Sequence, residues 1–361
     1  MAGVCTDGKL NPVPFLEAGY TPKEPFDQSP KEGPGPINEA IRQDIQTDLT
    51  AAFDSAPPSF RAQLCELKGI YVNPTGCTDR DPRTCSLEDD QIANNSWGFR
   101  QNSTGERRAY IAISLGLWKN DPSNPWTCTT PHNVVCAPPF QKYQTRLIGA
   151  LLQTLSRKAK NDDARPSFST VKPPAADTAA MSVLATLAHE FGHVYWLDTF
   201  VPDRGGPFRN STEFCKHTGL FYQPGSWSYP IDLPPGRWLG FGEILNRSNQ
   251  ADDSDVFQLP GLLAHGHFRD AGNHLNNIYR NGRWASALAA FSPIEEFVET
   301  FELFVLTNAK DGLQSLKIRI KGTRYYDDDI LDNLNQATRL GTSYQCFGDI
   351  PSSLLRSRRP R

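Results

Sequence analysis

Two histidines and a glutamate stand close together in the stretch TLAHEFGHVYW, which spans residues 186–196. In a helix, His189 and His193 lie on one face, because residues four apart are neighbours on the helix surface. Two neutral imidazoles in that position can bind one zinc ion, whose charge lowers the pKa of a bound water. Glu190 lies beside the same face, where its carboxylate can take the water's proton and pass it to a leaving amine. The spacing therefore predicts one zinc ion per chain, with His189 and His193 as ligands and Glu190 as the catalytic base.

The competing interpretation is an ordinary amphipathic helix that carries two surface or capping histidines. The chain contains only seven histidines, so an H-E-x-x-H pattern rarely arises in it by chance. The other side of the helix would be anchored in a core by Val183, Leu187, Phe191 and Val194. The small Gly192 would let another element approach closely. This context favours the metal site.

A zinc site of this kind needs a third protein ligand. The metzincin continuation would place glycine at position 196 and histidine at position 199, but the chain has Trp196 and Thr199 there. The stretch GTRYYD, residues 322–327, does not match the G-T-x-D motif of aspzincins. A glutamate on a later helix therefore remains. The stretch SPIEEFVETF offers Glu295, Glu296 and Glu299.

Glu295 and Glu299 are four residues apart, so on a helix one can bind zinc while the other hydrogen-bonds a ligand histidine. The four residues SPIE, which end at Glu295, also have the pattern of a helix start, in which the glutamate bonds back to the serine amide. In that interpretation Glu299 takes the metal. Glu296, Glu302 and a loop histidine remain as further alternatives.

Together, HEFGH and EEFVETF resemble the H-E-F-G-H and E-x-F-A-E-x-F pair of lethal-factor-type and related zinc peptidases, which are zincins of the gluzincin type. The resemblance covers these two short helices. It implies that Glu295 is the third zinc ligand and that Glu299 is the carboxylate that supports a ligand histidine. The interval between His193 and Glu295 is longer than in that family. No tyrosine stands a few residues before Glu295, where some members have one that stabilises the oxyanion.

The order of expected helices and strands predicts an α+β fold, and the cysteine pairs predict disulfide-stapled loops. The resemblance implies a zincin-like metallopeptidase domain with an active-site helix, a glutamate helix and a mixed sheet. One edge strand of the sheet is expected to line the cleft and to pair with a protein or peptide substrate. By this analogy the expected edge strand is AYIAISL, residues 109–115. Two alternatives stay open: an inactive zincin-fold binding protein, and a secreted scaffold or carbohydrate-binding protein without metal.

The rest of the chain fits a single catalytic domain, expected at residues 37–350, with a loop-rich insertion at 199–282. Residues 1–36 are rich in proline and are expected to form an extended arm over the surface. Residues 351–361 form a basic tail. Hydrophobic periodicity also predicts individual elements. The expected helices are residues 37–53, 143–159, 177–196, 291–309 and 327–341, and the expected strands are residues 68–72, 107–118 and 315–322.

Composition and cysteine usage limit the partners and the compartment. The net charge is −3 and no basic stripe is present, so we expect no nucleic-acid partner. No apolar run approaches the ~20 residues of a membrane span, and no signal peptide is visible. The eight cysteines favour an oxidising compartment and secretion, with eight buried free thiols of a cytosolic protein as the alternative. Cys77–Cys85 and Cys128–Cys136 are the expected disulfides, because each pair flanks a short polar loop.

Weaker candidates lie later in the chain. The stretch AHGHFRDAGNH carries His265, His267 and His274, and Tyr279 follows it. One of these residues could stabilise the oxyanion, although loop polarity is the ordinary reason for such histidines. The acidic run at residues 327–329 is expected at a helix start rather than at a calcium site.

Overall fold

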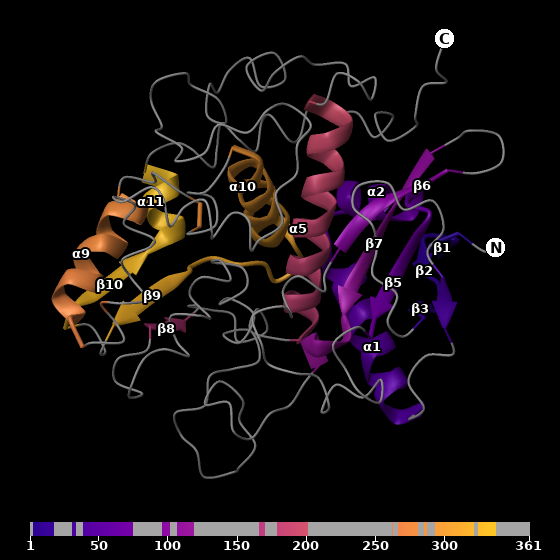
Figure 1. The fold of residues 1–361 in the computed structure, drawn as a ribbon, viewed down its shortest axis with the longest axis horizontal. Helices are drawn as coiled ribbons and strands as arrows, with labels where there is room; N and C mark the ends of the chain where they lie inside the picture. Colours follow the sequence, from indigo (N-terminus) through magenta and orange to yellow (C-terminus); the bar gives the residue numbers. More distant parts are fainter. Residues whose placement is uncertain are drawn as a thin grey trace.

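The computed structural model describes residues 3–17, 31–33, 39–74, 96–101, 107–118, 166–169, 179–200, 262, 266–280, 285–286, 293–320 and 324–336. Within these residues the fold is mixed helix and sheet, α+β, with a five-stranded mixed sheet as its largest sheet (Figure 1). The strands are β1 (Cys5–Thr6), β2 (Lys9–Leu10), β3 (Phe15–Leu16), β4 (Glu32–Gly33), β5 (Gly69–Asn73), β6 (Ser96–Gln101), β7 (Arg107–Ser114), β8 (Pro166–Ser169), β9 (Lys317–Ile320) and β10 (Tyr326–Asp329). The helices are α1 (Glu39–Ser55), α2 (Pro58–Glu66), α5 (Ala179–Phe200), α9 (Phe268–Tyr279), α10 (Pro293–Asn308) and α11 (Ile330–Gln336), with a short 3-10 helix at Leu115–Trp118.

The five-stranded sheet has the order β4-β3-β5-β7-β6. The inner strands β3, β5 and β7 run parallel, and the edge strands β4 and β6 run antiparallel to their neighbours. Side chains alternate between the two faces of a strand. Ile70 and Ile111 therefore face the main core, while Tyr71 and Tyr110 belong to a separate buried cluster on the opposite face. Both faces of the central strands are covered.

The helix α5 lies between the large sheet and α10 (Figure 1). Its apolar side chains occur all around the helix, which is typical of a helix buried inside a protein. It packs most extensively against α10 and α1, and it also contacts β6 and β7. Phe60 of α2 meets Phe191 of α5 and Phe301 of α10 edge-on, so three helices share one aromatic cluster. This packing fixes α5 relative to α10.

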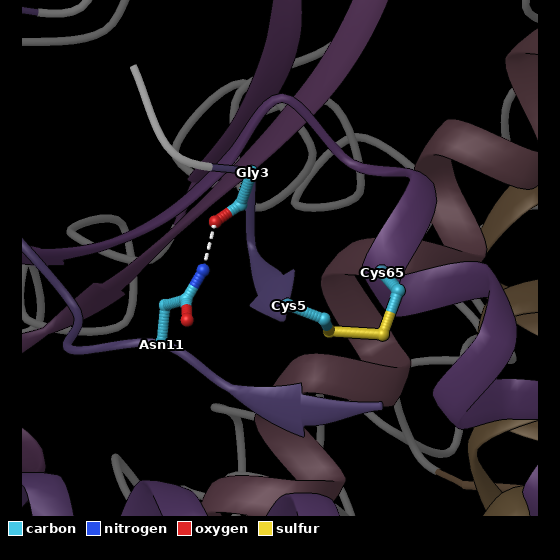
Figure 2. The surroundings of a disulfide bond; sticks show 4 residues. All are labelled: Gly3, Cys5, Asn11 and Cys65. Carbon is cyan, nitrogen blue, oxygen red and sulfur yellow. Dashed lines mark hydrogen bonds between the residues drawn. A yellow bond between two sulfur atoms is a disulfide. The ribbon is translucent and has the colours of Figure 1, made fainter. Parts of the chain in front are cut away.

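A disulfide fastens the N-terminal hairpin to α2 (Figure 2). Strands β1 and β2 are joined by Asp7 and Gly8, which both have positive φ angles, as a tight two-residue hairpin turn requires. Cys5 is bonded to Cys65, and Asn11 Nδ2 donates a 2.6 Å hydrogen bond to the Gly3 carbonyl. Because the cross-link joins residues 60 apart, loop closure alone accounts for about 4 kcal/mol of stability in the chain-entropy model.

A smaller layer forms beside α10. Strands β8, β9 and β10 make an antiparallel sheet in the order β10-β9-β8, and α9 packs on β10 (Figure 1). Gly272 of α9 is needed for this packing, because a Cβ atom there would lie 2.3 Å from the Tyr325 carbonyl oxygen. α11 follows β10 directly.

Three sequence predictions about the sheet and its neighbours are wrong. Residues 109–115 are not an edge strand: β7 has a neighbour on each side, and β6 is the outermost of the described strands on that side. The proline-rich arm does not simply cross the surface, because Phe15 and Leu16 of β3 are buried inside the sheet. Residues 327–329 belong to β10 rather than to a helix, and the helix begins only at Ile330.

Other predicted elements are confirmed. The helices expected at 37–53, 177–196 and 291–309 correspond to α1, α5 and α10, and the strands expected at 68–72 and 315–322 correspond to β5 and β9. The helix expected at 143–159 lies outside the described residues, as do the disulfides Cys77–Cys85 and Cys128–Cys136. Among the described helices, none combines the length and apolar character that crossing a membrane would require.

Candidate metal centre

His189 and His193 meet at the middle of α5 with their imidazole rings turned toward each other. Their Nε2 atoms are 3.3 Å apart and their ring planes are inclined at 77°. Two ligand atoms of a tetrahedral zinc ion, each at ~2.0–2.1 Å from the metal, lie about 3.3 Å apart. The two Nε2 atoms therefore have the separation that a shared zinc ion requires. The i and i+4 spacing on one helix produces this convergence.

Glu190 follows His189 directly and is buried, with 7% of its surface exposed. Its negative charge contributes to raising the pKa of His189, so its carboxylate lies within electrostatic reach of that ring. A buried carboxylate beside two imidazoles can hold and release a proton in a site shielded from bulk water.

The opposite nitrogen of His189 faces α10. Nδ1 of His189 lies 2.8 Å from Glu299 Oε1 and 3.4 Å from Glu302 Oε2. Both glutamate side chains are 2% exposed. A carboxylate at Nδ1 fixes the orientation of a metal-binding imidazole and raises its basicity. Glu299 thus occupies the position that such a supporting carboxylate needs.

Two positions around His189 could in principle receive a cation. On the Nδ1 side, single ligand atoms of His189, Glu299 and Glu302 lie within 4.8 Å of one another. The 2.8 Å between Nδ1 and Glu299 Oε1, however, is a direct contact distance, shorter than the ~3.3 Å between two ligands of one tetrahedral zinc ion. On the Nε2 side, the separation from His193 matches that value. The geometry fits a metal better on the Nε2 side.

The buried charges shift the pKa values of the site in opposite directions. Burial is the largest single influence on the pKa of His189 and lowers it, but the close contacts with Glu299 and Glu302, together with the charges of Glu299 and Glu190, outweigh burial and raise this pKa well above its ordinary value. Burial and the neighbouring charge of His189 lower the pKa of His193 well below its ordinary value. Burial, followed by the charge of Glu299, raises the pKa of Glu302 well above its usual range. His193 is therefore already neutral near pH 7, as a metal ligand must be.

Close packing of α5 on α10 brings the glutamates to the histidines. Gly192 of α5 lies against Val298 of α10, and a Cβ atom at Gly192 would be only 3.2 Å from the Val298 Cα. Phe191 and Phe301 stack at 5.9 Å beside this contact. The expectation that Gly192 admits a close neighbour is confirmed, and that neighbour is the glutamate helix.

The structure brings together four of the residues singled out from the sequence: His189, Glu190, His193 and Glu299. Glu295 lies in the first turns of α10, four residues before Glu299 and hence on the same side of the helix. The side chains of Glu295 and Glu296 lie outside the described part of the structure.

The weaker candidates fall elsewhere. His267 is exposed and lies 3.9 Å from Asp270, on α9's first turn. Tyr279 is buried in α9, the helix that packs on β10. His265 lies outside the described residues. Glu302 appeared among the alternatives only as a substitute ligand, although a glutamate between Phe301 and Leu303, three residues after Glu299, already indicated a buried charge on the same face.

Comparisons of the chain with models of protein families, with curated proteins and with solved structures found no match. The functional argument therefore rests on the residues of the site and on their geometry.

Proposed function

We propose that the chain is a zinc-dependent metalloendopeptidase of the zincin type that hydrolyses peptide bonds in protein or peptide substrates. The observation that carries the proposal is the arrangement around His189. The distance between His189 Nε2 and His193 Nε2 is that between two ligand atoms of one zinc ion. The other ring nitrogen of His189, Nδ1, contacts the buried carboxylate of Glu299. An ordinary buried helix has no need for either feature.

Glu295 is the proposed third ligand. Glu299 contacts the far side of His189, and Glu295 precedes it by one helical turn on the same side of α10. The resemblance to gluzincins gives the first glutamate of this pair to the metal. Two histidines and one glutamate leave an open position, which is typical of catalytic rather than structural zinc sites.

The proposed mechanism divides the work between the metal and Glu190. Zinc held here would supply positive charge that polarises the scissile carbonyl and lowers the pKa of a coordinated water. Glu190 accepts a proton from the attacking water and returns it to the nitrogen of the leaving amine. Glu299 keeps the ring of His189 in the required orientation.

The strand arrangement supports a place for an extended substrate. Among the described strands, β6 is an antiparallel edge of the mixed sheet, and α5 contacts both β6 and β7. An exposed edge can accept a peptide as one more strand through main-chain hydrogen bonds. We therefore assign the substrate-binding edge to β6 in place of residues 109–115. The Cys5–Cys65 disulfide supports an oxidising, extracytoplasmic location.

Glu190→Gln tests the proposal, because it keeps the shape of the side chain and removes the base. We expect the purified variant to retain about one zinc ion per chain while hydrolysis of an unfolded protein such as casein falls by at least ~100-fold. Elemental analysis and a casein digestion measure the two quantities. Glu39→Gln, an exposed change on α1, is the matched control and should match the wild type in both.

Each result separates one alternative. Wild-type protein without zinc would point to a scaffold or carbohydrate-binding protein. Zinc without hydrolysis would point to an inactive zincin-fold binding protein. Hydrolysis by Glu190→Gln at the wild-type rate would place the base elsewhere.

A further inference from the structure

Glu302 is a second buried carboxylate on the same nitrogen of His189. It follows Glu299 by three residues on α10, so both side chains point toward α5. Its Oε2 lies 3.4 Å from His189 Nδ1, against 2.8 Å for Glu299 Oε1. One N–H cannot satisfy two carboxylates, and one carboxylate would be enough to orient the ring.

The oxygens of Glu302 and Glu299 that face His189 have few other partners among the described residues. Neither Glu302 Oε2 nor Glu299 Oε1 accepts a hydrogen bond of good geometry from any residue in the described part of the chain. Among those residues, His189 is also the only basic group within ion-pair distance of either carboxylate. Phe301 and Leu303, on either side of Glu302, are buried apolar residues.

The charge count makes this arrangement unfavourable for folding alone. Glu190, Glu299 and Glu302 place three buried carboxylates around a pair of imidazoles. Burying a carboxylate without enough donors or a nearby cation costs stability, and an apolar or neutral side chain of similar volume is often at least as stable in its place. Glu302 is therefore not explained as a stabilising residue of the α5–α10 interface.

We propose that Glu302 is a positioning residue of the zinc site. Glu302 and Glu299 both contact Nδ1 of His189 from α10. These contacts hold the ring so that Nε2 points to the proposed zinc position between His189 and His193. This inference rests on the proposed zinc-dependent function and extends it to a residue that the gluzincin pair does not include.

Two measurements on the full chain test the role: zinc affinity by competition with a chromogenic chelator, and the melting temperature of the metal-free protein. We expect Glu302→Gln to weaken zinc binding about tenfold, near the lower end of the ~10–100-fold loss expected for Glu299→Gln. The melting temperature of metal-free Glu302→Gln should equal or exceed that of metal-free wild type, because the substitution removes a buried carboxyl group whose ionisation is unfavourable. Glu39→Gln, which removes an exposed carboxylate, should change neither quantity.

A structural residue would behave differently. If Glu302→Gln binds zinc as tightly as wild type, or if its metal-free melting temperature falls, the assignment is overturned. Glu302→Leu is a second variant for the case that Glu302→Gln fails to fold. It should fold without metal and bind zinc more weakly than wild type. Failure of both variants to fold would overturn the proposal. If wild-type protein binds zinc and only the Glu302 result fails, the proposed function survives. If wild-type protein binds no zinc, the proposed function fails first.

Discussion

Asp329 and the α10 residues Glu299 and Glu302 are all buried carboxyl groups, but they differ in the hydrogen bonds that they accept. Asp329 ends β10 and is 8% exposed. It accepts hydrogen bonds from the Ser315 hydroxyl and from the backbone amides of Leu316 and Leu331, the last at 3.1 Å. These bonds tie the segment before β9 to β10 and to the first turn of α11.

Glu299 and Glu302 are more deeply buried, and one oxygen of each has no such set of donors among the described residues. Each is 2% exposed, and His189 Nδ1 is the basic group that both of them contact. The oxygens that face it accept no well-formed hydrogen bond from the described residues.

The difference distinguishes a structural carboxylate from the carboxylates of the proposed zinc site. Donors from the chain fill the acceptor positions of Asp329, so its charge is compensated when the protein folds. The oxygens of Glu299 and Glu302 that face His189 accept no such hydrogen bonds from the described residues, and buried polar groups of this kind concentrate at functional sites. Removing Asp329 should therefore cost stability, whereas changing the glutamates should alter ligand binding.

The largest expected effect is on stability at Asp329. Asp329→Ala leaves several buried donors without an acceptor and removes the cap of α11, so we expect a loss of ~3 kcal/mol or more in the free energy of unfolding. Chemical denaturation of metal-free protein measures it. Asp332→Ala, exposed in the first turn of α11, is the control and should cost at most ~1 kcal/mol. An equal loss of unfolding free energy in the two variants would show that Asp329 has no special structural role.

The sequence predicted the elements of the site better than it predicted their surroundings. The i and i+4 histidines and the apolar residues around them identified α5, because helical periodicity is a local property. The edge strand could not be identified in this way. Residues 109–115 alternate well, but whether a strand is inner or edge depends on β6 and β5, which pair with it from other parts of the chain.

Long-range contacts also explain what else the sequence did not reveal. The Cys5–Cys65 bond, which was not among the expected disulfides, joins residues 60 apart, and cysteine spacing alone does not fix a connectivity. Phe15 and Leu16 stand among prolines, which favoured an exposed arm, yet β3 adds to the sheet beside β5. The position of Glu302 beside His189 depends on the register of α10 against α5, where Gly192 contacts Val298, and the sequence of α10 alone does not determine that register.

The next largest effect is the loss of zinc affinity of the protein when Glu295 or Glu299, which are four residues apart on α10, is replaced. We expect Glu299→Ala to weaken zinc binding ~10–100-fold, because it supports a ligand histidine without touching the metal. Glu295→Ala should lose zinc more completely, because it removes the proposed third ligand. Zinc titration of both purified variants decides the order. The reverse order would make Glu299 the ligand and leave Glu295 with the alternative role of a helix cap.

The smallest effect is the pH dependence of zinc binding, which follows from the contacts of Glu299 and Glu302 with His189. Glu299 and Glu302 hold the pKa of His189 well above its ordinary value in the metal-free protein, whereas the pKa of His193 is lowered. Zinc must displace one proton from His189, so affinity should rise about tenfold per pH unit as the pH increases toward that raised pKa, and should level off above it. His193 contributes no such dependence near neutral pH, since it is already deprotonated there.

Competition titrations between about pH 6 and 8 measure this slope. In Glu299→Gln the negative charge is lost, the pKa of His189 falls, and the levelling-off should move to lower pH even though the overall affinity is weaker. The sign follows from the direction of the shift: a group that holds its proton more tightly in the folded protein competes with zinc over a wider range of pH. A flat wild-type profile in this range would mean that His189 is already neutral there, and the carboxylates of α10 would then lack the influence on its nitrogen that their positions imply.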